Sequence, residues 1–247
     1  MLILVINPGS TSTKVAIFED ENKKIQKTLH HPSENLEKFD SLMEQKEYRE
    51  KAIFEFLEEC GYELEDFNAI ACRGGILPPL KSGTYRVNEE MIEYLKYKSR
   101  VKHASNLAAV IGFEMSNGKI PVFITDPISV DEMIYEARIS GIPEIERLSL
   151  AHALNIKAVA RKVASELEKK YEDLNMVVAH LGGGISVSAH LKGKMIDVNN
   201  ANDEGPFSPE RTGELPVADV VKLCFSGKYG HKEVKKMFVG KSGLVAY

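Results

Sequence analysis

The order of apolar and polar residues predicts an α/β protein that opens with three strands. Leu2–Ile6 is an apolar run that stops at Pro8 and Gly9, as a buried strand does where it enters a tight turn. Lys14–Phe18 resumes as a strand, and Lys24–Leu29 alternates like a third. Together the three runs predict an antiparallel meander.

Helices and buried strands alternate along the rest of the chain. Short apolar runs predict strands at 68–72 and 121–125. Helical spacing of apolar residues, with a cap at Asn88, predicts helices at about 36–59, 88–98, 105–115 and 152–171, and further helical segments up to Phe238.

The opening pattern of strand, loop, strand, turn and strand recurs about 170 residues later. The second copy runs through Asn175–Leu181, three glycines, Ile185–Leu191, a turn at Gly193 and Lys194–Val198. A duplicated hairpin unit predicts two lobes, an N-terminal lobe at 1–148 and the first part of a C-terminal lobe at 149–247.

Composition limits the classes of function. The 247 residues carry a net charge of −4, so no basic excess favours nucleic acid or an anionic membrane as a partner. Cys60, Cys72 and Cys224 lie far apart without metal spacing, which predicts reduced thiols and a cytoplasmic protein. The apolar N-terminus lacks the basic start of a signal peptide, and no run approaches the roughly 20 apolar residues of a membrane span.

The first hairpin loop carries chemistry suited to phosphate. Residues 7–14 read Asn-Pro-Gly-Ser-Thr-Ser-Thr-Lys, so a tight turn presents backbone N–H groups, several hydroxyls and the ammonium of Lys14. No helix is predicted to follow, so this is not a GxxxxGK[ST] phosphate loop. The alternative is an ordinary Gly/Ser hairpin.

The second hairpin loop follows His180 and contains Gly182, Gly183 and Gly184. Three consecutive glycines weaken a sheet unless the backbone must approach a ligand closely. A glycine-rich turn beside an interior histidine is the alternative for this loop alone. Because the pattern occurs twice, the two hairpins predict a clamp on a polyphosphate.

Four polar residues stand singly at strand ends or in loops: Arg73, Asp126, His152 and Arg211. Arg73 follows a buried strand and precedes two glycines, which predicts a guanidinium at the mouth of that strand. Arg211 lies in a polar loop, 203–216, that is too long and structured for a plain connector. The alternatives are surface ion pairs for the arginines, a turn cap for Asp126 and packing for His152.

In these segments the sequence resembles the acetate and butyrate kinases of the sugar kinase, actin and heat-shock ATPase superfamily. The segments that match follow the order of that family: NPGSTSTK (7–14), RGG (73–75), TDP (125–127), SVDEM (129–133), HALNIKAVAR (152–161), HLGGGISV (180–187) and EGPFSPERTG (204–213). The RGG, HALN, HLGGG and SPERTGELP segments are typical of butyrate and branched-chain fatty acid kinases rather than acetate kinases.

The resemblance implies duplicated ribonuclease H-like lobes of the actin-like ATPase superfamily. The second lobe is expected to be incomplete, because the family continues past residue 247 with most of the adenine pocket. The resemblance also implies reversible, in-line phosphorylation of butyrate or a related short-chain carboxylate, with ATP/ADP and Mg²⁺ as cofactors, by a homo-oligomer. The alternatives are an acetate or propionate kinase, or an actin-like ATPase module without a metabolic substrate.

The resemblance assigns roles by position to a metal shell, to two phosphate loops and to the reacting groups. Arg73 and Arg211 would hold the carboxylate and the phosphoryl group, Asp126 would orient an arginine or magnesium-bound water, and His152 would reach the phosphoryl group. The other implied positions are Asn7 for the magnesium shell, Ser10, Ser12 and Lys14 for the first loop, and His180, Gly182, Gly183 and Gly184 for the second.

Overall fold

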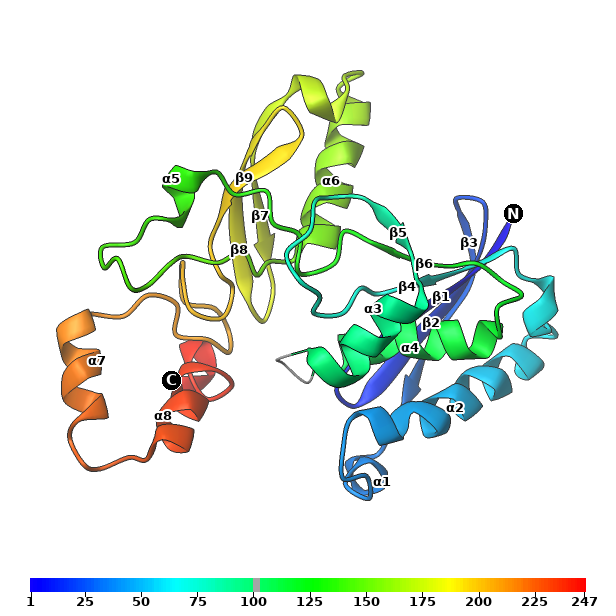
Figure 1. Ribbon diagram of the computed structural model, residues 1–247, viewed down its shortest axis with the longest axis horizontal. Coiled ribbons are helices and arrows are strands. Elements are labelled where there is room, and N and C mark those ends of the chain that lie inside the picture. The colour runs from blue at the N-terminus through cyan, green and yellow to red at the C-terminus, as the bar shows by residue number, and fades with distance from the viewer. Residues whose placement is uncertain (100–102) are drawn as a thin grey trace. The chain divides into compact units, whose positions relative to one another are not determined.

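The computed structural model describes residues 1–99 and 103–247, which form two compact units, Met1–Ser129 and Val130–Tyr247 (Figure 1). The sequence-based division assigns segment 130–148 to the first lobe, but this segment packs with the second unit. Val130 and Met133 are buried there against Ala153 and Ile156.

The first unit is built on a six-stranded sheet in the order β3-β2-β1-β4-β6-β5. The predicted meander is confirmed, because the first three strands pair antiparallel, and β4 and β6 continue the sheet in parallel with β1. This is the strand order of a ribonuclease H-like lobe, with β5 added as an antiparallel edge. The strands are β1 (Leu2–Pro8), β2 (Ser12–Glu19), β3 (Asn22–His30), β4 (Ala69–Cys72), β5 (Thr84–Arg86) and β6 (Val122–Thr125).

Helices of the first unit cover the sheet. The central helix, α4, is buried on nearly all sides, and Gly112 permits its close approach, because a Cβ there would lie 2.5 Å from the sulfur of Cys72. Asn88 accepts a hydrogen bond from the N–H of Met91 and caps α3 as predicted. The helices are α1 (Ser33–Leu36), η1 (Met43–Gln45), α2 (Lys46–Glu59), η2 (Leu64–Asp66), α3 (Glu89–Glu93), the π-helical η3 (Tyr94–Lys98) and α4 (Ser105–Ser116).

The predicted helix at 36–59 is wrong in its first part, since α2 begins only at Lys46. The backbone N–H of Asp40 and the hydroxyl of Ser41 both donate to the carboxylate of Glu44, at 2.9 and 3.0 Å. Asp and Ser favour such turns over a helix interior because they offer the backbone alternative hydrogen bonds.

The second unit repeats the three-stranded meander, as the recurrence predicted. Its sheet has the order β7-β8-β9 with antiparallel pairing, and α6 lies along it (Figure 1). The elements are α5 (Tyr135–Arg138), α6 (Ala153–Glu166), η4 (Tyr171–Asp173), β7 (Asn175–Leu181), β8 (Ile185–Leu191), β9 (Lys194–Val198), α7 (Val217–Cys224), α8 (His231–Phe238) and η5 (Gly243–Ala246).

The helix predicted at 152–171 is too long at its C-terminal end. Glu168 takes the left-handed conformation with φ 55°, and the N–H of Lys169 donates to the carbonyl of Ala164 at 2.9 Å, which ends α6 in a Schellman-type motif. In the described parts of the chain, no helix has the length and apolar character needed to cross a membrane.

Candidate active site

The first hairpin loop joins β1 to β2 and leaves hydrogen-bond donors available. The N–H of Gly9 donates to the carbonyl of Ser12 at 2.7 Å and closes the turn. Within the described residues, the backbone N–H groups of Ser10 and Thr11 have no acceptor. Lys14 is exposed and lies opposite Asn7 in the antiparallel register. The loop therefore presents N–H groups, hydroxyls and an ammonium together, as an anion site requires.

Arg73 lies beside Asn7 because their strands are parallel neighbours. Ile6 pairs with Cys72 in the register of β1 and β4, so the residues that follow leave the same edge of the sheet. Nη1 of Arg73 donates to Oδ1 of Asn7 at 3.4 Å. Burial lowers the pKa of the Arg73 guanidinium, and no carboxylate in the described structure forms an ion pair with it. The surface-ion-pair alternative is therefore wrong for Arg73.

Asp126 follows β6 and is fully buried, with a left-handed φ of 40°. Its Oδ1 accepts hydrogen bonds from the hydroxyl of Ser82 at 2.6 Å and from the N–H of Gly83 at 2.9 Å. The carboxylate thus fixes the segment that leads into β5, as the turn-cap alternative predicts. Its role toward a reacting group stays a prediction.

Two predicted histidines stack on each other in the second unit. The rings of His152 and His180 have centroids 3.9 Å apart and planes inclined by 12°. Nδ1 of His152 contacts the hydroxyl of Ser186 at 2.9 Å, and Nδ1 of His180 contacts Oδ1 of Asn155 at 2.8 Å. Burial lowers the pKa of His180, so its neutral form is favoured. Both rings are held in fixed orientations next to the second hairpin loop.

Arg211 lies directly over this loop. A Cβ at Gly184 would lie 2.2 Å from its Nη1, so only glycine leaves room for the guanidinium. Nη1 donates to the carbonyl of Ala201 at 2.6 Å, and the hydroxyl of Ser208 donates to the carbonyl of Gly183 at 2.5 Å. Burial lowers the pKa of Arg211, and again no ion pair forms within the described residues. The structure thus brings His152, His180, the glycines and Arg211 together.

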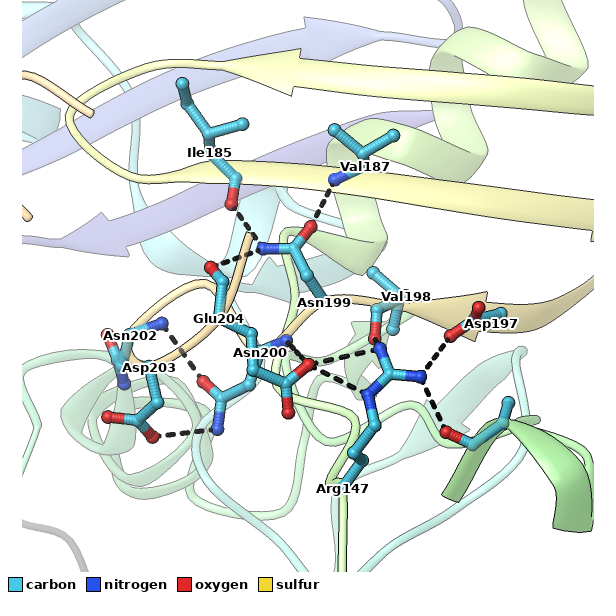
Figure 2. Close-up of polar contacts among 11 residues, drawn as sticks. Arg147, Ile185, Val187, Asp197, Val198, Asn199, Asn200, Asn202, Asp203 and Glu204 are labelled. Atoms are coloured by element: carbon cyan, nitrogen blue, oxygen red, sulfur yellow. Dashed lines mark hydrogen bonds and ion pairs between the residues drawn. The ribbon is translucent and has the colours of Figure 1, made fainter. Parts of the chain in front are cut away.

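Figure 2 shows a polar cluster that sequence reasoning missed and that connects Arg147 and β8 with the segment 199–204. Arg147 binds the carboxylates of Asp197 and Glu204 at 3.0 and 3.1 Å. The side chain of Asn199 accepts from the N–H of Val187 at 2.6 Å and donates to the carbonyls of Ile185 and Glu204 at 2.9 and 3.1 Å. These bonds tie the start of the loop to β8, so Ala201 is held where its carbonyl meets Arg211.

Comparison with known proteins decides the family. The model of the Acetokinase family matches residues 144–247. The chain is 60% identical to "Probable butyrate kinase 1" of Thermotoga maritima and 59% identical to "Probable butyrate kinase" of Thermotoga petrophila. Each alignment covers 99% of this chain and 69% of the relative. The chain belongs to the acetokinase family.

Solved structures share the fold of this acetokinase-family chain. The acetate kinase of Porphyromonas gingivalis has a TM-score of 0.75 at 17% identity, and a propionate kinase of Francisella tularensis has 0.73 at 20%. Both comparisons cover 99% of this chain and 69% of the solved one. The actin-like ATPase fold is therefore confirmed, and with the family so is the predicted enzyme class, a kinase with a carboxyl group as acceptor.

Proposed function

We propose that the chain uses ATP to phosphorylate butyrate and related short or branched-chain carboxylates, forming ADP and an acyl phosphate. The observation that supports this most is that each unit has a phosphate-suited hairpin loop and a half-buried arginine without a carboxylate partner among the described residues. An arginine in an ion pair is already neutralised. Arg73 and Arg211 instead keep planar donor forks that match carboxylate and phosphate oxygens.

The chemistry needs positioning more than proton transfer. A carboxylate oxygen forms a bond to the γ-phosphorus while the bond from that phosphorus to the ADP oxygen breaks, and no proton is removed because the acid is ionised at neutral pH. Repulsion between the two anions is the main obstacle, and an arginine such as Arg73 in one unit or Arg211 in the other offers donors that would reduce it. Removing one such donor from a desolvated site typically raises the barrier by roughly 2–4 kcal/mol.

The residues fit a nucleotide with a hydrated metal ion. The available N–H groups of Ser10 and Thr11 suit phosphate oxygens. No group of three or more His, Cys, Asp or Glu side chains in the described residues forms a metal cage. Mg²⁺ would suit such a site because it keeps several waters and binds substrate phosphates, and Asn7 would help to hold it there. Bound there, it would neutralise charge on the phosphates.

A carboxylate series tests the proposal. ADP formation is coupled to NADH oxidation with acetate, propionate, butyrate and isobutyrate, and hydroxylamine traps the acyl phosphate. Two more buried methylenes are worth about 1.6 kcal/mol, so we expect kcat/KM for butyrate to exceed that for acetate by about fifteenfold. A higher value for acetate or propionate would favour the alternative kinases. ATP turnover that ignores every carboxylate would refute the proposal in favour of an ATPase module.

Assembly and location stay predictions. Family resemblance supports a homo-oligomer, which light scattering of the purified chain tests directly. The three cysteines are free, and burial raises the pKa of Cys72 to about 12, which supports a reduced, unreactive thiol.

A further inference from the structure

A fully buried arginine lies beneath the first hairpin loop. Arg49 belongs to α2 and has 0% exposure. Its Nη1 donates to the carbonyls of Gly9 and Ser12, both at 3.0 Å, and its Nη2 donates to the carbonyl of Ser10 at 2.9 Å. One guanidinium therefore holds three carbonyls of one short loop.

Every partner of this guanidinium is a neutral oxygen. Besides the loop carbonyls, Arg49 bonds to the hydroxyl of Thr13 at 3.1 Å and to the amide oxygen of Gln45 at 3.0 Å. No carboxylate in the described parts of the chain forms an ion pair with it. Burial lowers the pKa of Arg49, but a guanidinium still keeps its proton at neutral pH. The protein thus buries a positive charge without a negative side chain beside it.

The remaining neighbours do not offset this charge either. His31 contacts the hydroxyl of Thr13 through Nε2 at 2.8 Å, and burial together with Arg49 lowers its pKa to about 4, so it is neutral at pH 7. The backbone N–H of His31 donates to the carbonyl of Thr11 at 2.8 Å. All four carbonyls from Gly9 to Ser12 are therefore bonded within the protein. The N–H groups of Ser10 and Thr11 are the donors that remain.

We propose that Arg49 is a positioning residue for the ATP phosphates at the first hairpin loop. It fixes the loop carbonyls, so that the N–H groups remain available to phosphate oxygens, and its charge is offset by the bound nucleotide. A buried charge acts strongly on a nearby anion because the surrounding dielectric constant is low. The inference rests on the proposed function of the loop and adds a residue that never touches the substrate.

Three variants separate this role from a merely structural one. Arg49→Gln removes the positive charge, and Arg49→Lys keeps the charge but loses the planar guanidinium donors. Lys46→Met is the control, because Lys46 lies one turn earlier on α2 and binds Glu114 instead of the loop. We expect Arg49→Gln to raise KM for ATP at least tenfold with KM for butyrate within twofold of wild type. Arg49→Lys should give a smaller rise, and Lys46→Met none beyond twofold.

The Tm and the active fraction of each variant separate a positioning role of Arg49 from a structural one. A structural role would lower Tm and the active fraction, hence kcat, while leaving both KM values unchanged, and that result would overturn the inference. If Arg49→Gln does not fold, Gln45→Ala takes its place, since it removes the amide that orients the guanidinium. ATP affinity measured by calorimetry keeps the two proposals apart. In assays of the complete protein, a wild type that binds ATP without using any carboxylate refutes the proposed function, whereas unchanged ATP affinity in the Arg49 variants refutes this inference.

Discussion

Gly184→Ala would test whether the shape of the second hairpin loop fixes Arg211. A Cβ at this position would lie 2.2 Å from Nη1 and 2.6 Å from Cζ of the guanidinium. Ordinary contacts need about 3.5–4.0 Å, so the guanidinium must retreat by roughly 1.5 Å. It would then lose its 2.6 Å bond to the carbonyl of Ala201. Displacing a catalytic group by about 1 Å can cost a hundredfold, so we expect kcat/KM for butyrate to fall by about that factor.

A double-mutant cycle shows whether the effect passes through Arg211. Steady-state kcat/KM is measured for Gly184→Ala, for Arg211→Ala and for the pair, with Gly141→Ala as a control because nothing lies within 4 Å of a Cβ there. In the Arg211→Ala background, Gly184→Ala should cost less than about threefold, since the group it displaces is gone. If Gly184→Ala lowers kcat/KM by the same factor in both backgrounds, the reasoning is refuted. It is also refuted if kcat/KM of the Gly184→Ala single variant stays within twofold of wild type.

Three other predictions follow from buried polar groups. Burial lowers the pKa of His31 and of His190 to about 4 in the folded chain. Between pH 6.5 and 4 the unfolded chain therefore binds more protons than the folded chain, so the free energy of unfolding falls as the pH drops through this window. The loss should be roughly 3 kcal/mol for each histidine, and urea titrations of His31→Gln across this range should show a smaller loss. Asp126→Asn keeps an oxygen for Ser82 and Gly83, so we expect a folded protein with strongly reduced kcat and a less affected KM for butyrate; an unchanged kcat would contradict the assigned role. Asn199→Ala removes three hydrogen bonds and should cost about 3 kcal/mol at an unchanged m-value in urea, whereas a loss below about 1 kcal/mol would show that the loop relaxes without them.

The strands were predictable because their signal is local. Apolar runs ended by Pro-Gly or by three glycines mark β1 and β7, and their recurrence revealed the duplicated meander. The errors lie where side chains compete with the backbone or where neighbours decide. The Glu44 carboxylate accepts hydrogen bonds from Asp40 and Ser41, and α2 begins only after this turn. Glu168 takes the left-handed conformation, so α6 ends earlier than predicted. Nothing in a run of polar residues shows which of these local bonds will form.

Sequence reasoning named the candidate site residues but not the residues that hold them in place. Arg73 stands out because it follows a buried strand and precedes two glycines, and Arg211 because it lies in a long polar loop that contains Pro and Gly. Arg49 and Arg147 lie in ordinary charged segments, and only the folded chain shows that one holds a hairpin loop and the other the base of the Arg211 loop. Supporting contacts join residues 40 or 57 positions apart, as Arg49–Gly9 and Arg147–Glu204 do, and no local pattern encodes such distances.

The partners of the arginines divide them into two kinds. Arg138 and Arg147 bind carboxylates, so their charges are neutralised within the protein and they act as structural anchors. Arg49, Arg73 and Arg211 bond only to neutral oxygens in the described structure, and burial lowers the pKa of each. The carboxylates of Glu210 and Asp203 act on Arg211 from nearby and raise its pKa against the effect of burial, although neither forms an ion pair with it. Burying a cation without an ion-paired carboxylate is costly, so binding an anion beside it is favourable. Under the proposed function, ATP and a carboxylate would bring negative charge to such arginines in each unit.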